Sequence, residues 1–306
     1  MTRSLRGRTL FITGASRGIG LAIALRAARD GANIAIAAKT DTPHRSLPGT
    51  IHTAAAEIVA QGGRALPLVC DIREEPQIEA AVARTVEEFG GIDILVNNAS
   101  AVRLTGIRQT PLARFDLMHA VNVRGSLATM QHVLPHLLRS EHAHVLSISP
   151  PLDLAVRWFA PHAPYSITKY GMSLLVLGAA GEFRGRVAVN ALWPRTAIDT
   201  AAMREIGRHL ELGKLRSAEI MGDAAWWVLT SDPASLSGRF LIDDEVLRAH
   251  GVEDLSRYAP PGVTELELTP DLFVASLAEL AATPAPATTT GDAAIPPERQ
   301  TIWPNR

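Results

Sequence analysis

Tyr165 and Lys169 are the two residues whose types and spacing best suit chemistry. They stand four positions apart in a stretch that predicts a helix, so both side chains lie on one face of it. A free phenol titrates near ~10, and a neighbouring ammonium lowers that pKa by favouring the phenolate. Tyr165 could then exchange a proton with an alcohol or carbonyl oxygen. The alternative is an ordinary pair on a surface helix.

Lysine is rare in this chain, which has 30 basic residues but only the lysines Lys39, Lys169 and Lys214. Arginine stays protonated and cannot pass a proton onward. A lysine retained at position 169 of an arginine-rich chain therefore favours a chemical role.

A glycine-rich turn over residues 13–20 predicts a phosphate-binding loop. It reads Thr-Gly-Ala-Ser-Arg-Gly-Ile-Gly and joins an apolar run to a helical stretch. Glycine permits a tight turn, and the helix N-terminus offers N–H groups and partial positive charge to a pyrophosphate. An ordinary strand-to-helix turn is the alternative. The expected cofactor contacts are Gly14, Ser16, Arg17, Gly18, Ile19 and Gly20.

The end of the second predicted strand favours NADP(H) over NAD(H). It reads Ala37-Ala38-Lys39-Thr40 and lacks the acid that accepts from ribose hydroxyls in NAD sites. Lys39 and Arg17 would meet a 2′-phosphate, unless Lys39 is a solvated loop lysine and the cofactor is NAD. Asp71, followed by Ile72, is placed to contact the adenine amino group, to cap the next helix, or both.

Four motifs in order resemble the short-chain dehydrogenase/reductase family over about residues 8–245. They are the glycine-rich turn, Asn97-Asn98-Ala99, Asn122 within Val121-Asn122-Val123, and Tyr165-Ser166-Ile167-Thr168-Lys169. The resemblance implies an alcohol dehydrogenase or carbonyl reductase that exchanges hydride with a nicotinamide.

The same resemblance implies roles for individual residues. Asn98 and Ala99 would support the sheet and the adenine pocket, Lys169 would hold the nicotinamide ribose, and Thr200 would bind the carboxamide. Asn122 would bind a water that links Lys169 to solvent; alternatively, it is a mid-helix asparagine at a kink.

The family also uses a serine to orient the substrate oxygen, and here the sequence departs from the pattern. The usual Ile-Ser-Ser has become Ile148-Ser149-Pro150-Pro151. Adjacent strand residues face opposite ways, so Ser149 reaches the site only if the prolines bend the chain. We predict Ser149 for this role, with Ser147 or no serine as alternatives.

The Ser-Pro-Pro departure and Lys39 more closely resemble the hydroxysteroid dehydrogenase-like branch, type 2, of the same family, which implies NADP binding. Longer members of that branch append a sterol-carrier domain, and this sequence ends before one. The branch name does not establish steroid chemistry.

Aromatic residues predict an apolar substrate pocket for a lipophilic alcohol, ketone or aldehyde. They are Trp158, Phe159 and Trp193, and packing in the core is an equally good interpretation of them. Arg195 stands where the family usually has glycine. Met203–Gly213 predicts a mobile lid. The Ser-Pro-Pro and Arg195 departures keep open a different class of function, a non-catalytic cofactor- or lipid-binding protein.

Strand-like and helix-like segments alternate over most of the chain. This pattern predicts an α/β fold, a Rossmann-type doubly wound parallel sheet of about seven strands with helices on both faces. The expected strands are Thr9–Thr13, Asn33–Ala38, Ala65–Val69, Ile92–Val96, His144–Ser149, Val187–Leu192 and Gly238–Ile242. One domain over residues 1–280 is expected, in which Leu247–Leu280 is an extra helix or lid element. A flexible tail rich in Pro, Ala and Thr is expected over 281–306.

Bulk properties exclude several classes. The chain has 306 residues, 47% of them hydrophobic, and a net charge of -1, so nothing suggests a nucleic-acid partner. No apolar run reaches the ~18 residues that span a bilayer, and the single cysteine suits a reducing, cytoplasmic setting. His132 and His136 are spaced like a metal pair, but no metal site is predicted because the resemblance places them on a dimerisation helix. It implies a homodimer or homotetramer through Pro111–Leu138 and Tyr165–Phe183.

Overall fold

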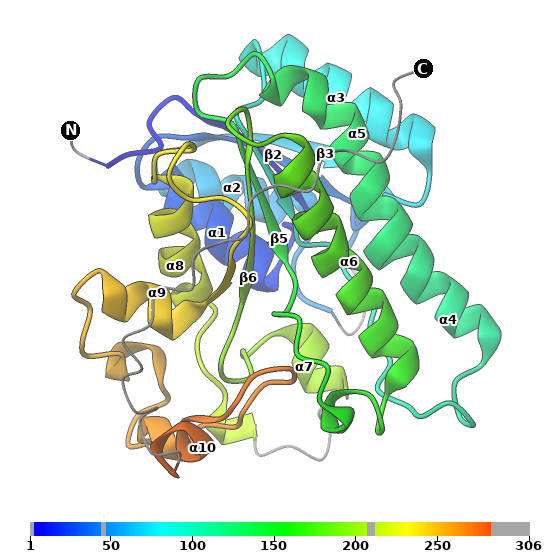
Figure 1. The fold of residues 1–306 in the computed structure, drawn as a ribbon. Helices are drawn as coiled ribbons and strands as arrows, with labels where there is room; N and C mark the ends of the chain where they lie inside the picture. The colour runs from blue at the N-terminus through cyan, green and yellow to red at the C-terminus, as the bar shows by residue number, and fades with distance from the viewer. Residues whose placement is uncertain (1–2, 44–46, 207–211, 283–306) are drawn as a thin grey trace, which may run out of the picture.

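Seven parallel strands form one sheet in the order β3-β2-β1-β4-β5-β6-β7 (Figure 1). The computed structural model describes residues 3–43, 47–206 and 212–282, without the side chains of Glu205 and Leu212. The predicted doubly wound sheet is thereby confirmed. The strands are β1 (Thr9–Thr13), β2 (Asn33–Ala38), β3 (Arg64–Val69), β4 (Ile94–Asn97), β5 (His144–Ile148), β6 (Ala188–Trp193) and β7 (Phe240–Ile242).

Burial explains why these strands read as continuous apolar runs. Every residue of β1, β2, β4, β5 and β6 is buried, because helices cover both faces of the sheet. The edge strand β3 is only partly buried, and there Pro67 needs no ladder partner on its outer side.

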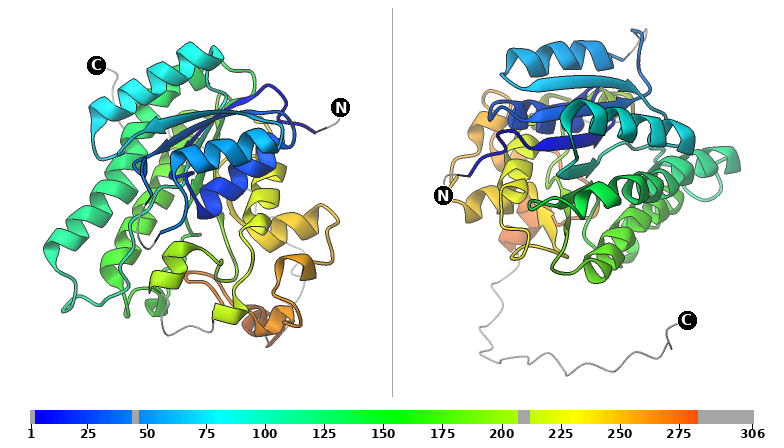
Figure 2. Two further views of the ribbon diagram at one scale, coloured as in Figure 1. Left: turned by 180° about the vertical axis from the view of Figure 1, so that it is seen from behind. Right: turned by 90° about the horizontal axis from the view of Figure 1, so that it is seen from above.

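The helices lie in two layers, one on each face of the sheet (Figure 2). Helices α1, α2 and α8 enclose one apolar cluster with the sheet, and α3, α5 and α6 enclose the other. The helices are α1 (Gly18–Ala28), α2 (Ile51–Ala60), α3 (Glu75–Phe89), α4 (Leu112–His119), α5 (Ser126–Leu137), α6 (Ala163–Glu182), α7 (Ala201–Ile206), α8 (Glu219–Leu229), α9 (Asp243–Ala249) and α10 (Leu277–Ala282). None of these described helices is long and apolar enough to cross a membrane.

The long helix expected over Pro111–Leu138 is divided. A π-helical segment, Ala120–Gly125, separates α4 from α5, and Asn122 lies within it. The π-helical segment packs closely against Ile72. A Cβ on Gly125 would lie 2.7 Å from Ile72 Cδ1, so this position has no room for a side chain. Such π segments are rare and often occur at functional sites.

The chain beyond β7 returns to the carboxyl ends of the strands. After α9 it makes 3₁₀ turns at Ser256–Tyr258 and Glu265–Glu267, then runs beside α7 before α10 (Figure 1). Ala197 N–H donates to Thr269 O at 2.8 Å, and Thr196 bridges to Pro270. The expected tail lies outside the described residues except for Ala281 and Ala282, which end α10, so that domain boundary stays a prediction.

Stability should fall in acid because β5 begins with a buried histidine. His144 is 1% exposed, and burial lowers its pKa to about 3. In the unfolded chain the imidazole of His144 has a pKa of ~6.5 and binds a proton below that pH, whereas in the folded state it stays neutral down to about pH 3. The contribution of His144 to the free energy of unfolding is therefore highest above the pKa of the unfolded state. It decreases as the pH drops below that value, by about 1.4 kcal/mol per pH unit.

Urea unfolding of His144→Phe, measured from pH 7 to 4, should show a shallower loss of stability than the wild-type protein. The matched control His119→Gln removes an exposed imidazole and should keep the wild-type slope. Equal slopes for His144→Phe and wild type would contradict this assignment.

Candidate active site

A cavity of about 530 Å³ opens at the carboxyl ends of the strands. In doubly wound sheets ligands bind at this edge, where the strand order reverses, here between β1 and β4. The residues predicted for the site that line the cavity are Gly14, Ser16, Arg17, Gly18, Ile19, Lys39, Asp71, Ile72, Asn98, Ala99, Tyr165, Lys169 and Thr200. Gly20, Asn122 and Ser149 are not among its lining residues.

The glycine-rich turn meets the requirements of a phosphate cradle. Gly14 and Gly18 have φ values of +71° and +60°, which side chains rarely adopt. Helix α1 begins at Gly18 without a side-chain cap, so its first N–H groups are open to a ligand. The residues present therefore fit a dinucleotide phosphate at this end.

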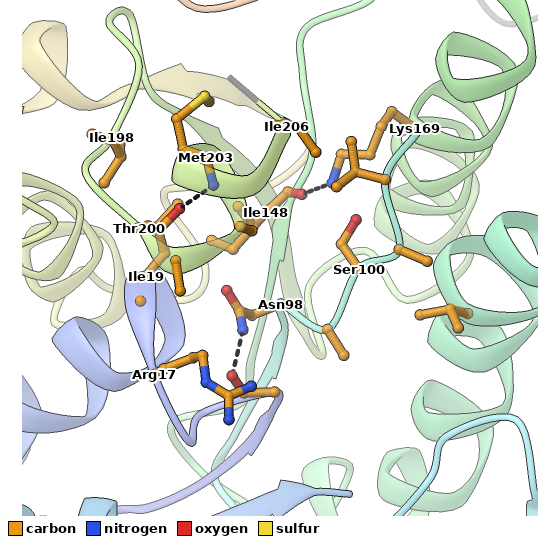
Figure 3. A pocket seen from close by; sticks show the side chains of 18 of the residues that line it. Arg17, Ile19, Asn98, Ser100, Ile148, Lys169, Ile198, Thr200, Met203 and Ile206 are labelled. Atoms are coloured by element: carbon orange, nitrogen blue, oxygen red, sulfur yellow. Dashed lines mark hydrogen bonds between the residues drawn. The ribbon is translucent and has the colours of Figure 1, made fainter. Parts of the chain in front are cut away.

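Asn98 joins the glycine-rich turn to β4. Its Nδ2 donates to Thr13 O at 2.8 Å and to Gly14 O at 3.2 Å. Figure 3 shows the Asn98 side chain directed at the turn. A Cβ on Gly20 would lie 2.5 Å from the same Nδ2. Gly20 is thus required by packing against Asn98 and does not itself face the cavity.

Basic side chains gather beyond β2 and β3. Lys39 lines the cavity, and Arg17 donates from Nε and Nη2 to the carbonyls of Pro48 and Gly49, each at 2.7 Å. Arg73, which the sequence analysis missed, also lines the cavity and binds Asp71 through both carboxylate oxygens.

Asp71 does not cap a helix, so that interpretation is wrong. Helix α3 begins at Glu75 with Glu74 at its N-cap position. Asp71 Oδ1 instead accepts from Arg73 N–H at 3.1 Å within the preceding turn. The hydrogen bonds from Arg73 hold the pKa of Asp71 below its usual value.

Tyr165 and Lys169 lie one turn apart on α6, and both are buried where they line the cavity. Lys169 Nζ donates to Ile148 O at 2.6 Å, at the end of β5 (Figure 3). It also lies 4.9 Å from the ring centroid of Trp193. Ile148 and Trp193 therefore hold the ammonium against the sheet edge.

The predicted lowering of the phenol pKa is wrong for this structure. Burial, and then the negative charge of Asp271, raise the pKa of Tyr165 above its ordinary value. Burial lowers the pKa of Lys169 to about 7. Desolvation outweighs the expected effect of the ammonium because it disfavours the charged form of both groups.

Asn122 is buried and bridges two elements. Its Oδ1 accepts from Ala101 N–H at 2.7 Å, and its Nδ2 donates to Ala101 O at 3.0 Å and Thr168 Oγ1 at 2.9 Å. These bonds tie the loop after β4 to α6, the helix that carries Tyr165 and Lys169. The side chain thus supports the site from behind the cavity wall.

Ser149 is 1% exposed and its Oγ has no hydrogen-bond partner among the described residues. Its N–H donates to Ser147 O at 3.0 Å, so the chain turns at the end of β5. That turn leaves Ser149 outside the cavity lining, and its substrate-orienting role stays a prediction. Ser100, which the sequence analysis did not consider, does line the cavity (Figure 3).

Phe273 occupies the space expected for the aromatic pocket. It is 1% exposed and has a φ of 70°, an unusual value for a bulky residue. Its ring lies 6.1 Å from Trp158 and 6.2 Å from Tyr165, centroid to centroid. Trp158 is therefore packed in the core. Phe159 packs against Tyr170 in a tilted arrangement, with 5.1 Å between ring centroids, and only Trp193 of the predicted trio lines the cavity.

The C-terminal segment supplies wall residues that no sequence motif indicated. Pro270, Asp271 and Leu272 line the cavity, and Trp193 Nε1 donates to Leu272 O at 2.8 Å. Local patterning could not have placed them, since Asp-Leu-Phe in an irregular segment carries no signal of its own.

Arg195 fastens this segment in place. Its Nε donates to Asp244 at 2.6 Å, its Nη2 pairs with Glu245, and its Nη1 donates to Ala275 O at 3.0 Å. The arginine at a position that usually holds glycine thus has a structural role.

Part of the predicted lid can be located. Thr200, Ala201, Ala202, Met203 and Ile206 line the cavity from α7 and its approach. Thr200 Oγ1 accepts from Met203 N–H at 3.1 Å (Figure 3). Residues 207–211 of the expected lid lie outside the described residues.

The model of the short chain dehydrogenase family matches residues 8–211. The chain therefore belongs to this family of oxidoreductases, as its motifs indicated. Among curated proteins it is similar to hydroxysteroid dehydrogenase-like protein 2 of Danio rerio, with 56% identity over 275 residues, 89% of this chain and 65% of that protein. The chain thus spans just under two-thirds of that relative's length, and the branch resemblance is confirmed.

Solved structures agree with this assignment. A protein from Xanthomonas campestris is 55% identical with a TM-score of 0.84, over 90% of this chain and 100% of that chain. A metagenomic short-chain oxidoreductase in complex with NADP is 26% identical with a TM-score of 0.64, over 78% of this chain and 97% of that chain.

Proposed function

We propose that this protein is an NADP(H)-dependent oxidoreductase that interconverts a lipophilic alcohol and its ketone or aldehyde, with Tyr165 as general acid/base. One observation carries the proposal: Tyr165 and Lys169 share a single cavity with the uncapped N-terminus of α1. A proton-transferring group and a phosphate cradle in one cavity match the needs of hydride-transfer chemistry.

A nicotinamide dinucleotide, when bound, would supply or accept the hydride. The N–H groups of the glycine-rich turn would hold its pyrophosphate, and Lys39 with Arg17 would face a 2′-phosphate. The NADP complex of the related metagenomic oxidoreductase supports this choice of cofactor. NAD is the less favoured alternative.

The electrostatics favour carbonyl reduction. Because the pKa of Tyr165 is raised, its phenol keeps the proton at neutral pH and can give it to a carbonyl oxygen. The cavity wall beside it is mainly apolar, with Val102, Ile148, Trp193 and Leu272. Such a wall suits a lipophilic carbonyl compound.

A non-catalytic cofactor- or lipid-binding protein is the second candidate. The position of Ser149 outside the cavity lining favours it, because no serine of the usual motif then reaches a substrate oxygen. Arg195 no longer supports it, since that side chain fastens the C-terminal segment.

A homodimer or homotetramer is also proposed, through the long helices. On α6 the apolar side chains of Ile167, Leu174 and Leu177 are 53%, 57% and 50% exposed. Their spacing of seven and three residues places them on one face of the helix. In a dimer with a two-fold axis, the same face of α6 from a second copy of the chain would cover these side chains.

The Tyr165→Phe variant tests the chemistry. Turnover of a panel of medium-chain, terpenoid and steroid carbonyls, followed by NADPH absorbance, should fall by about 10²–10⁴-fold because the proton donor is lost. NADPH affinity, measured by fluorescence, should stay close to wild type.

The matched control Tyr258→Phe removes a buried hydroxyl that bonds to Asp223 outside the cavity, and it should keep its turnover. Wild-type turnover by Tyr165→Phe would exclude the acid/base role. Tight NADPH binding by the wild-type protein with no turnover on the whole panel would favour the binding-protein candidate.

The Lys39→Ala variant tests the cofactor. NADPH affinity should fall by about tenfold or more, since a charge-assisted bond contributes about 1.5–3 kcal/mol, while NADH affinity should not change. Lys214→Ala is the control, because Lys214 does not line this cavity. Equal binding of both cofactors, unaffected by Lys39→Ala, would reject a phosphate contact.

The double variant Leu174→Arg with Leu177→Arg tests the assembly. Sedimentation velocity should give an oligomer for the wild-type protein and a monomer for the variant, because two like charges would be buried at the interface. Leu266→Arg, at a residue that is 66% exposed in the C-terminal segment, should sediment as the wild-type protein does. A wild-type monomer would contradict the proposal.

A further inference from the structure

Large apolar side chains are exposed on the two loops that follow β4 and β5. Ile107 and Leu112, on the first loop and the start of α4, and Leu154 and Val156, on the second loop, are between 77% and 79% exposed. Leu104, also on the first loop, is exposed to a lesser degree. Single exposed aliphatic residues are common, but a group of them marks an interaction surface. We call these five residues the apolar rim.

The two loops lie side by side at the carboxyl edge of the sheet. Each loop begins where its strand ends, and β4 pairs directly with β5. A Cβ on Gly106 would lie 3.7 Å from Pro161 O, so the first loop is close to the end of the second. Figure 1 shows both loops at the lower right, where α4 and α6 begin. The apolar rim therefore belongs to one surface of the molecule.

This surface borders the active-site cavity. Leu104 belongs to the apolar rim and also lines the cavity, together with Val102 from the same loop. Met203 and Ile206 of α7 add further apolar side chains to the cavity wall. The apolar rim is thus continuous with an apolar part of the cavity.

Arginines accompany the apolar rim on the first loop. Residues 103–114 include Arg103, Arg108 and Arg114 and no acidic residue. All three arginines are exposed, and none of them lies within 4.0 Å of a carboxylate of any described residue. This loop therefore presents uncompensated positive charge to solvent.

The charged groups of the second loop are already engaged. Asp153 accepts from Trp158 Nε1 at 2.6 Å, and Arg157 pairs with Glu279 at 2.5 Å. Asp153 thus turns its carboxylate toward its own loop. The net charge of the surface is set by the arginines of the first loop.

Exposed apolar side chains flanked by cations suit an anionic lipid bilayer. The aliphatic tips would enter the headgroup region, and the arginines would meet lipid phosphates. A second copy of the chain fits this surface less well, because a two-fold axis would bring the same arginines toward one another. The charge therefore favours lipid as the occupant.

We propose that the apolar rim, with Arg103 and Arg108, docks on an anionic lipid bilayer and turns the mouth of the active-site cavity toward the membrane. This inference goes beyond the proposed function, because binding to lipid requires no turnover. It agrees with a lipophilic substrate, since such a compound partitions from water into a bilayer and could reach the cavity from there.

Flotation of the whole chain with lipid vesicles tests the surface. The protein should float with vesicles of phosphatidylcholine mixed with phosphatidylserine, and high salt should weaken this binding because it screens the arginines. Vesicles of phosphatidylcholine alone should bind the protein more weakly, since they carry no net charge.

A charge variant isolates the contribution of the arginines. Arg103→Gln with Arg108→Gln should lower the partition coefficient for the mixed vesicles by about 30-fold, because each arginine near an anionic surface contributes about fivefold. Arg184→Gln with Arg186→Gln is the matched control and should bind as the wild-type protein does. Both control arginines are exposed between α6 and β6, at the opposite edge of the sheet.

An apolar variant isolates the contribution of the aliphatic side chains. Ile107→Gln with Leu154→Gln leaves every charge in place and should lower the partition coefficient by about tenfold or more, because less apolar surface is buried in the lipid. Val59→Gln with Val69→Gln is the matched control. These two valines are 58% and 57% exposed outside the apolar rim, and their replacement should leave binding unchanged.

Absence of wild-type binding to the mixed vesicles would overturn the proposal, and so would wild-type binding by both rim variants. Loss of an oligomer in Ile107→Gln with Leu154→Gln, measured by sedimentation velocity, would assign the surface to a second copy of the chain and would equally overturn it. Tyr165→Phe should bind vesicles as the wild-type protein does, so a failure of the proposed chemistry and a failure of lipid docking are distinguishable.

Discussion

The burial of a lysine and a tyrosine at the end of a parallel sheet is the constraint on which this site depends. Desolvation disfavours both charged forms, so it depresses the pKa of Lys169 and raises that of Tyr165. The ammonium is retained there because β5 presents the carbonyl of Ile148 to it and β6 presents the face of Trp193. The parallel pairing of β5 with β6 brings these two partners together.

Around that pair, the wall is assembled from parts of the chain that are distant in sequence. Asn122 holds α6 from behind through Thr168, and the C-terminal segment closes the front through Asp271 and Leu272. Phe273 accepts an unfavourable φ because five aromatic neighbours bury its ring. A site that spans four regions of the chain requires the whole fold to be in place before it exists.

Most of the fold could be predicted because buried parallel strands leave a strong pattern: β1 and β2 begin and end at the predicted residues. The π-helical segment at Asn122 could not, since a single wide turn hardly changes helical periodicity. For Asp71 the sequence left an adenine contact and a helix cap open, and only the structure excludes the cap, because Arg73 binds both carboxylate oxygens and α3 begins later, after Glu74. The role of Trp158 was ambiguous in the sequence because aromatic residues suit a pocket and a core equally well. In the structure Trp158 packs against Phe273 and belongs to the core.

By itself, the sequence determined whatever depends on short spacing. The glycine-rich turn, the one-turn separation of Tyr165 and Lys169, and the alternation of strands and helices are local properties that chain chemistry imposes. Only the tertiary structure decided the electrostatics of the site. The direction of each pKa shift depends mainly on how deeply a group is buried, and the burial of Tyr165 and Lys169 is produced by segments that are distant from them in the sequence.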